Sequence, residues 1–419
     1  MKLKIKRSFK NKNYVLNETI ISPSEISFYL YEPKYLFYEI KVNVGDLVLV
    51  GQVIAIKKNK NYTINVLSSV SGRVIFVDTL RTNPIIKIIN DQEFMEYTTI
   101  TPSFLPKTKD ELVNIIQNFG IIGLGGGGFP TSIKINRSNV IKKLVINCVE
   151  CEPYLISDKF LFTKELTKIF ACFVLLKQIL NIEKVIIAIK KTSSDLIKSI
   201  KTYLDNNLSY KDFICLYITK DFYPAGYEIN LVNKISKLKL LTTDIPVDHD
   251  HLVINLSTAY AIYLATYEKK PLNYRYVLVS DMNKRQELYK VIIGTTYFEL
   301  LKEFDLTNKL IISGGPMMGN RIDNLNHTTT ILTSAVFVTK KIKSEENVCI
   351  KCATCIKNCP VKISPYHINK HAKYQNIKAL EKENAYLCCG CGICSYVCPS
   401  SIDLTHNISL VKRRKVKTR

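Results

Sequence analysis

Two cysteine runs in the last quarter of the chain constrain its fold more than any other feature. Each has the spacing C-x-x-C-x-x-C-x-x-x-C-P, and the runs begin at Cys349 and Cys388. Three thiolates spaced by two residues can bind one face of a cuboidal cluster, and the Cys of the Cys-Pro pair turns away to a second cluster. The runs therefore predict a segment that folds around two [4Fe–4S] clusters.

The predicted ligands cross between the two runs. Cluster one takes Cys349, Cys352, Cys355 and Cys398, and cluster two takes Cys388, Cys391, Cys394 and Cys359. Structural zinc sites use two separated C-x-x-C pairs and do not repeat a three-thiol run before Cys-Pro, so we expect iron rather than zinc. Cys389 lies between two ligands and is surplus to the pattern, which predicts a passive thiol.

We expect a cytosolic chain whose clustered cysteines bind metal. Nine of the 13 cysteines lie between Cys349 and Cys398, and a cytosolic protein keeps such a dense group for metal rather than for disulfides. The basic N-terminus lacks the apolar segment of a secretory signal. No run reaches the 18 or so apolar residues of a membrane helix; the uncharged run Leu252–Tyr267 is interrupted by polar residues, and we expect an apolar helix there.

The length of 419 residues exceeds what one hydrophobic core usually organises, so we expect several domains. Apolar residues make up 47% and charged residues 23%, as in globular proteins. The expected fold class is α/β multidomain, with a barrel-sandwich module at 1–105, an α/β flavin- and nucleotide-binding domain at 106–270, a small β-grasp-like unit at 271–335 and a two-cluster ferredoxin-type domain with a basic tail at 336–419.

Local patterns support these segments. Residues 40–77 alternate in polarity around three glycine turns, which is typical of hairpins in a small barrel. This segment is similar to biotinyl and lipoyl domains but lacks their modified-lysine tip, so we expect a structural module. Residues 110–270 alternate strand-like and helical runs, which predicts a mostly parallel sheet. After Pro271 the pattern predicts two strands and a helix.

A glycine loop from Gly120 to Gly128 holds six of the sixteen glycines, followed by Phe-Pro-Thr. Glycines allow backbone N–H groups to approach a phosphate or a planar ring that a Cβ would block. The loop does not match the Rossmann or P-loop patterns. The residues alone therefore leave a nucleotide and a flavin both open.

Two further motifs follow the glycine loop, Asn147-Cys-Val-Glu-Cys-Glu-Pro-Tyr154 and Tyr223-Pro-Ala-Gly-Tyr-Glu228. In this order, ahead of two ferredoxin runs, they resemble the C subunit of the Rnf-type ion-translocating electron transport complex. The resemblance covers essentially the whole chain. The middle region also resembles, more distantly, the NADH-binding flavoprotein subunit of respiratory complex I.

The resemblance implies a bound FMN and a site for NAD(H). It places beside the flavin phosphate and ring the residues Gly123, Gly125, Gly126 and Gly128, with Asn147 and Glu150 next to the ring. It implies that Phe129 stacks near the nicotinamide, that Lys134 neutralises phosphate and that Glu228 hydrogen-bonds the dinucleotide. Two positions depart from the complex I pattern, because Val149 and Tyr227 stand where that flavoprotein has acidic residues.

The resemblance also implies a function and a location. We expect an oxidoreductase and translocase subunit, peripheral on the cytoplasmic face of the bacterial inner membrane. Electrons would pass from NADH to FMN, to the clusters and on to the membrane subunits. The expected partners are integral and peripheral subunits of the same complex, with NADH or ferredoxin as redox partner. The alternative that this pattern leaves open is a soluble flavin and iron–sulfur reductase of a corrinoid enzyme.

Charge and the remaining motifs carry less information. The net charge is +23, but only ten of 59 basic residues are Arg, and Arg is the better reader of phosphate. We therefore attribute the charge mainly to composition drift and expect no nucleic-acid partner. The Asp248–His251 stretch (Asp-His-Asp-His) predicts a solvated loop, and Ile311–Asn320 predicts a tight glycine turn.

Overall fold

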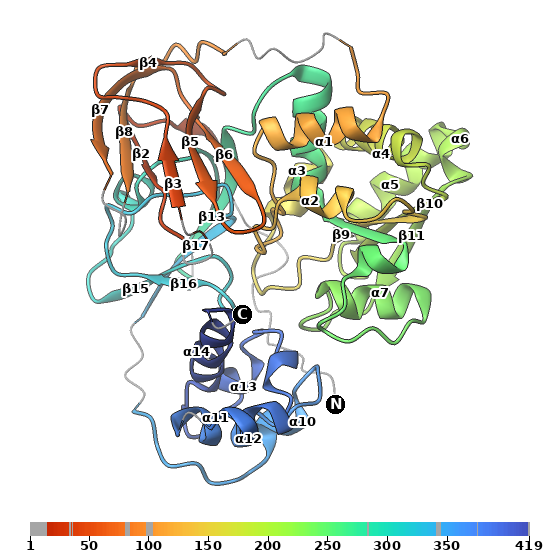
Figure 1. Cartoon of the computed structure of the whole chain (residues 1–419), viewed down its shortest axis with the longest axis vertical. Helices are drawn as coiled ribbons and strands as arrows, with labels where there is room; N and C mark the ends of the chain where they lie inside the picture. Colours follow the sequence, from red (N-terminus) through yellow and green to blue (C-terminus); the bar gives the residue numbers. More distant parts are fainter. Residues whose placement is uncertain are drawn as a thin grey trace.

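The computed structural model describes residues 15–32, 35, 37–79, 84–97, 104–282, 285–340, 345–374 and 376–417, and the side chains of 17–19 and 411–417 lie outside that description. The basic N-terminus, residues 1–14, and the side chains of the basic tail therefore lie outside the described residues. Within them the chain is a mixed α/β protein with several packed units (Figure 1). None of its described helices is both long and apolar enough to cross a bilayer.

The N-terminal unit is a sandwich of two antiparallel sheets, drawn in red and orange in Figure 1. One sheet has the order β2-β8-β7-β4, formed by Glu25–Tyr29, Ile85–Asn90, Gly72–Asp78 and Leu47–Val48. The other has the order β3-β5-β6, formed by Phe37–Ile40, Val53–Lys58 and Thr63–Leu67. Inward residues such as Ile26, Ile54 and Ile88 are fully buried between them, as alternation in strands requires.

The second unit is built on a parallel sheet of order β11-β10-β9-β12. Its strands are β9 (Lys143–Cys148), β10 (Lys184–Lys190), β11 (Ile214–Thr219) and β12 (His251–Asn255). Its helices are α1 (Lys109–Asn118), α2 (Thr131–Asn136), α3 (Ser157–Lys164), α4 (Leu166–Leu180), α5 (Ser194–Asn206), α6 (Leu208–Lys211), α7 (Glu228–Ser236) and α8 (Leu256–Tyr263). The predicted parallel sheet is confirmed.

The run Leu252–Tyr267 is not the single helix that the sequence predicted. Its first residues belong to β12, which pairs with β9, and α8 begins only at Leu256. Of the four residues before this run, Asp248 and His249 are exposed, as the predicted solvated loop requires. His251 departs from that prediction, because it belongs to β12, is only 5% exposed and has its Nε2 2.6 Å from Ser236 Oγ. Burial lowers the pKa of His251. Asp248 forms a two-pronged ion pair with Arg137.

The third unit is a six-stranded sheet of order β1-β14-β13-β17-β15-β16. Its strands are β1 (Val15–Ile21), β13 (Tyr274–Ser280), β14 (Gln286–Ile292), β15 (Lys309–Ser313), β16 (Asn320–Ile322) and β17 (Ala335–Lys340), with helix α9 at Tyr297–Leu301. The predicted unit at 271–335 is therefore too short at its end, since β17 runs to Lys340.

The sheet also takes a strand that the sequence assigned to the first module. Residues 15–21 form β1, which pairs in parallel with β14. An uncovered β14 would leave a row of backbone N–H and C=O groups unpaired, and β1 satisfies them. The boundary at residue 105 therefore does not separate these two units. The β-grasp description of this unit stays a prediction.

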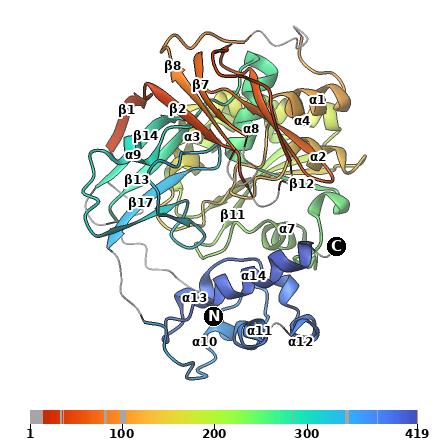
Figure 2. The same ribbon diagram turned by 60° about the vertical axis from the view of Figure 1, so that its left-hand side comes forward.

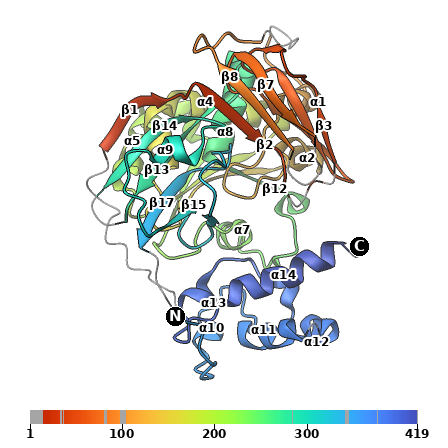
Figure 3. The ribbon, with the colours of Figure 1, turned by 90° about the vertical axis from the view of Figure 1, so that its left-hand side faces the viewer.

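The C-terminal unit is a small helical domain, drawn in blue beneath the rest of the molecule (Figures 2 and 3). Its helices are α10 (Thr354–Lys357), α11 (Pro365–Lys373), α12 (Ile377–Lys382), α13 (Ile393–Tyr396) and α14 (Leu404–Lys417). The short helices α10 and α13 lie within the two cysteine runs and occupy matching places in them. Ile363, Ile368 and Ile408 form part of a small buried core.

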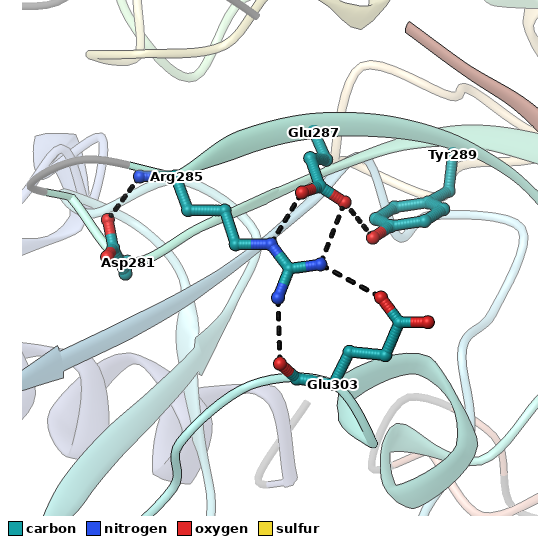
Figure 4. Close-up of polar contacts among 5 residues, drawn as sticks. All are labelled: Asp281, Arg285, Glu287, Tyr289 and Glu303. Carbon is teal, nitrogen blue, oxygen red and sulfur yellow. Dashed lines mark hydrogen bonds and ion pairs between the residues drawn. The ribbon is translucent and has the colours of Figure 1, made fainter. Parts of the chain in front are cut away.

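One polar network closes the hairpin between β13 and β14 (Figure 4). The Arg285 guanidinium donates to both carboxylate oxygens of Glu287 and to the carbonyl and carboxylate of Glu303. Its backbone N–H donates to Asp281 Oδ1 at 2.9 Å. The Tyr289 hydroxyl also donates to Glu287. These contacts lower the pKa of Glu287, with Arg285 as the main cause.

Replacing Glu287 by Gln should change how the stability of the fold depends on pH. Because the folded pKa of Glu287 lies below its ordinary value of 4.5, the carboxylate stabilises the fold above that value, and this stability is lost as the pH falls through the folded pKa. Chemical denaturation at several pH values measures the free energy of unfolding. Between about pH 6 and pH 3 the parent should lose roughly 1 kcal/mol more of this free energy than Glu287→Gln loses. The control is Glu303→Gln, which changes an exposed partner of the same Arg285 and should lose almost as much unfolding free energy as the parent. If the unfolding free energies of the parent and of Glu287→Gln changed equally with pH, the prediction would be wrong.

Candidate flavin and cluster sites

The carboxyl edge of the parallel sheet has a topological switch point between β9 and β12. The chain adds β10 and β11 on one side of β9 and then returns to place β12 on the other side. Ligands of open α/β sheets bind at such points, outside the carboxyl ends of the strands. Asn147 near the end of β9 lies opposite Asn255 at the end of β12 in the strand register. The edge therefore presents two side-chain amides from neighbouring strands.

The glycine loop lies over this edge. Its backbone is closed by hydrogen bonds from Gly123 N to Phe129 O at 2.8 Å and from Gly128 N to Gly123 O at 3.0 Å. A Cβ on Gly125 would lie 3.2 Å from the Asn255 side chain. Leu124 N donates to Thr258 Oγ1, in α8, at 2.9 Å. The loop is thus held on β12 and α8 by its own backbone.

The opposite face of the loop is open. Gly125, Gly126 and Gly127 are exposed, and a Cβ on Gly126 or Gly127 would have no heavy atom within 4 Å. Gly126 has φ +100° and Gly128 has φ +58°. Both angles lie in the left-handed region, which favours glycine. An open cradle of backbone N–H groups at a sheet switch point fits the phosphate and ring of a flavin.

Lys134 and Glu228 meet at one end of this edge. Lys134, in α2, donates to Glu228 Oε1 at 2.8 Å and to Val253 O of β12 at 2.6 Å. Glu228 is the first residue of α7. Phe129 is 47% exposed, and its ring lies edge-on to Tyr62 of the sandwich, with centroids 5.7 Å apart. Lys134 of α2 and Glu228 of α7 therefore meet beside β12, and Phe129, in the loop itself, contacts the sandwich.

The side chains of Asn147 and Glu150 form hydrogen bonds with backbone groups at this edge. Asn147 Nδ2 donates to Gly226 O at 2.9 Å, which joins β9 to the loop after β11. The Glu150 carboxylate accepts from Asp158 N and Lys159 N and so caps the start of α3, where a negative charge is favourable. The sequence placed both residues beside the flavin ring, and the structure places both at the carboxyl edge.

Sequence reasoning missed three polar residues of this edge. The Asn255 side chain donates to Asp158 Oδ2 at 2.6 Å and lies under Gly125. Arg275 of β13 is 5% exposed, and its Nε makes no hydrogen bond within the described part of the chain. Burial lowers the pKa of Arg275, while Asp158 and Glu150 oppose that shift. Asn255 ends β12 and caps α8, and an Asn at such a place was the one local sequence signal that pointed to these residues.

The two predicted ligand sets line separate cavities. One cavity is lined by Cys349, Cys352, Cys355 and Cys398, the set predicted for cluster one. The other is lined by Cys359, Cys388, Cys391 and Cys394, the set predicted for cluster two, together with Cys389. The fold thus brings together the cysteines that the crossed pattern grouped, and four thiols around one cavity fit a [4Fe–4S] cluster.

The surroundings of the two cavities differ. Cys352 is exposed, as are Val348 and Ile350 next to it, whereas Cys394 is buried. Burial raises the pKa of the Cys394 thiol to about 12. A hydrogen bond with Thr354 lowers the pKa of Cys352. The cluster-one cavity is therefore the more open to solvent of the two.

The loop that carries Cys388 and Cys391 of the second cavity contacts the flavin domain. Tyr227, the residue that departs from the complex I pattern, is near Cys388, Cys389 and Cys391; burial is the main cause that raises its pKa, and these thiols add to it. The neighbouring Tyr223 donates its hydroxyl to Cys391 O at 2.7 Å. The motif Tyr223–Glu228 thus lies between the carboxyl edge and cluster two.

Family comparisons agree with this division of the chain. Residues 116–264 match the Nuo51 FMN-binding domain, and residues 348–403 match the 4Fe-4S dicluster domain. The first range contains the glycine loop and the parallel sheet, and the second contains both cysteine runs. The chain therefore carries an FMN-binding domain and a domain for two [4Fe–4S] clusters.

One solved structure shows a similar fold. It is the NAD⁺-reducing [NiFe]-hydrogenase in the H₂-reduced state, with a TM-score of 0.50 at 14% identity, over 74% of this chain and 61% of that one.

Curated relatives are similar over most of the chain. The C subunit of the ion-translocating oxidoreductase complex of Buchnera aphidicola is 31% identical over 94% of this chain and 87% of its own length. The C subunit of the Na⁺-translocating ferredoxin:NAD⁺ oxidoreductase complex of Acetobacterium woodii is 29% identical over 82% of this chain and 80% of its own length. These relatives are named as members of such complexes, which does not favour the corrinoid reductase alternative. The chain belongs to the family of C subunits of ion-translocating oxidoreductase complexes.

Proposed function

We propose that this protein carries electrons from NADH through FMN and two [4Fe–4S] clusters to membrane subunits of its complex. One observation supports the proposal: the motif Tyr223–Glu228 contacts both the carboxyl edge, where we expect the flavin, and the cysteine loop, where we expect cluster two. Glu228 pairs with Lys134 at the flavin edge, and the Tyr223 hydroxyl donates to Cys391 O beside cluster two. A flavin domain and a cluster domain in contact at one short loop suit electron transfer between them.

The chain's own residues would hold the flavin by backbone and charge. Gly125 and Gly126 would offer N–H groups and room for the phosphate and ring, and Lys134 would neutralise phosphate charge. Gly123 and Gly128 would shape the loop beside the flavin, because their own N–H groups close it. Asn147 and Glu150 would keep the edge beside the ring in shape through their bonds to Gly226 and α3. When bound, FMN accepts two electrons together and releases them singly, which matches a nicotinamide to one-electron clusters.

The nicotinamide site would use the exposed side of the same loop. Phe129 presents nearly half of its surface there, and an aromatic face suits stacking on a planar ring. Glu228 would accept hydrogen bonds from the dinucleotide. Val149 and Tyr227 replace acidic residues of the complex I pattern, so this chain would hold the dinucleotide with fewer carboxylates.

The location and partners follow from the family. We infer a peripheral position on the cytoplasmic face of the bacterial inner membrane, with integral and peripheral subunits of the same complex as partners. A relative is named for ferredoxin and NAD⁺, and we extend that pair to this chain as its redox partners, with NADH as the first choice. Ion movement would be the task of the other subunits.

The glycine loop gives the direct test of flavin binding. Gly126→Val should abolish FMN binding and the NADH-dependent bleaching of the flavin band under anaerobic conditions, because its methyl groups would fill the open cradle. Iron content should not change. Absorbance and flavin extraction on the reconstituted protein measure both.

Gly45→Val is a matched control for this variant. Gly45 also has φ +100° and no heavy atom within 4 Å of an added Cβ, but it lies in the sandwich. Both variants therefore carry the same backbone strain, and only Gly126→Val should lose FMN. Full flavin occupancy in Gly126→Val would refute the role of the loop, and a parent that binds FMN but is not bleached by NADH would refute the nicotinamide site.

The cysteine assignment predicts a graded loss of iron. The parent should hold about eight iron atoms, the content of two [4Fe–4S] clusters. Cys355→Ala should remove the signal of one cluster, whereas Cys389→Ala should leave both. Iron and sulfide analysis with electron paramagnetic resonance measures this. Zinc in place of iron, or equal loss from Cys389→Ala, would show that the ligand sets are wrong.

Membrane attachment should resist salt. If the protein docks on integral partners by shape and apolar contact, it should stay in the pellet after native membranes are washed in about 1 M salt, where the screening length falls to roughly 3 Å. Attraction between exposed lysines and anionic lipid would be lost under those conditions. An immunoblot of pellet and wash decides between the two, and release from membranes that keep every partner would point to the basic tail.

A further inference from the structure

The glycine turn Gly314–Gly319, between β15 and β16, has no role in the sites described so far. In the structure it contacts the flavin domain. Met317 N donates to Glu152 Oε2 at 3.1 Å, and a Cβ on Gly315 would lie 2.2 Å from Glu152 Cδ. The carboxylate of Glu152, from the motif that follows β9, therefore lies directly against the backbone of this turn.

The same turn contacts the cluster-two run on its other side. A Cβ on Gly392 would lie 2.4 Å from Met317 O, so the two backbones are in direct contact. Gly392 also has φ +78°. That angle alone does not demand glycine here, because Ala353, at the matching place of the first cysteine run, adopts φ +58°. The close approach of Met317 is what excludes a side chain at 392.

Two hydroxyl groups of the flavin domain complete the contact. Tyr223 is 2% exposed and donates to Cys391 O at 2.7 Å. Thr242 Oγ1 donates to Leu387 O at 2.9 Å. Figures 2 and 3 both show the cluster domain beneath α7, and Figure 3 shows β15 beside α7 above it. The backbone of 387–392 is thus held from two other units.

We propose that Glu152, Tyr223, Thr242 and Met317 form a cluster-two seat, which fixes the loop 387–392 against the flavin domain and makes cluster two the cluster that exchanges electrons with the flavin. These are positioning residues, because they act through the backbone of the loop. The inference rests on the proposed function. In that transfer, cluster two would accept one electron from the reduced flavin, which would be oxidised by one electron, and would pass it to cluster one, whose cavity is the more open to solvent.

The exposure of the two cavities supports this order. Cys352 and its neighbours Val348 and Ile350 are exposed, with Val348 at 89%, whereas the cluster-two loop is covered by the seat. A centre that receives electrons from inside the protein needs contact with the flavin domain, and a centre that passes them to a partner needs a free face. Among the described residues, the seat gives contact with the flavin domain to the cluster-two loop and not to the loop of cluster one.

The first test compares two glycines of the same loop. Gly392→Ala places a methyl group against Met317 O, whereas Gly390→Ala meets no heavy atom within 4 Å, although both positions have positive φ. Both variants should bind the iron of two clusters. Because the loop must move away from Met317 O, and electron transfer between two centres slows as their separation grows, flavin-to-cluster transfer should be severalfold slower in Gly392→Ala than in Gly390→Ala. The rate is followed by stopped-flow absorbance after light-driven reduction of FMN.

A milder pair of variants keeps the test independent of cluster assembly. Tyr223→Phe removes only the hydroxyl that holds Cys391 O. Tyr260→Phe, in α8, removes a similarly buried hydroxyl, which lies 3.1 Å from the hydroxyl of Tyr274 in β13; neither residue belongs to the seat or to its glycine turn. Amide hydrogen exchange of residues 385–394 in the loaded protein should be roughly tenfold faster in Tyr223→Phe, equivalent to about 1.4 kcal/mol, as expected for one lost buried hydrogen bond. Tyr260→Phe should leave that segment unchanged.

The parent protein separates this inference from the proposed function. If reduced FMN never reduces the clusters of the parent, the proposed function fails. If the parent transfers electrons but Gly392→Ala and Gly390→Ala do so at equal rates, the seat is refuted. Unchanged exchange of residues 385–394 in Tyr223→Phe would refute it as well. Light-driven reduction avoids any dependence on the nicotinamide site.

Discussion

The parallel pairing of β9 with β10 on one side and β12 on the other is the constraint on which the flavin site depends. It places Asn147 and Asn255 side by side at the carboxyl edge, and it makes Val253 O available to Lys134. The glycine loop has no support of its own beyond short turns, so it needs Asn255 and Thr258 beneath it. Loss of the β9–β12 register by one residue would turn these side chains to the other face of the sheet.

The same edge also joins the three other units. The sandwich reaches the start of the glycine loop, where a Cβ on Gly120 would lie 2.3 Å from Asn65 O. The six-stranded sheet contributes Arg275 beneath α3 and the turn at Met317. The cluster domain contributes the loop that accepts from Tyr223. Buried polar contacts of this kind stabilise a structure only when all of them are made together, so the units constrain one another's positions.

Local sequence patterns predicted much of the fold and both cluster cavities. Strands β9, β10 and β11 were found because each is a short apolar run between helical patterns, and the cysteine spacing already determines which thiols can share a cluster. β12 was missed because the apolar residues of a buried strand continue without a break into those of α8. The pairing of β1 with β14 and the contacts of Tyr223, Thr242 and Arg275 join residues distant in the sequence, and no local pattern records such pairs.

The two cysteine runs show how the surroundings differentiate a repeated motif. Residues 351 and 353 of the first run and 390 and 392 of the second occupy matching places, and all four have positive φ. In the first run these places hold Lys351, which is exposed, and Ala353. In the second run glycine at 392 leaves room for Met317 O, whereas a Cβ at 390 would meet no heavy atom within 4 Å. Solvent exposure is among the factors that set the potential of an iron–sulfur cluster. Identical ligand spacing therefore does not impose identical potentials, and the contacts outside the motif distinguish the inner centre from the outer one.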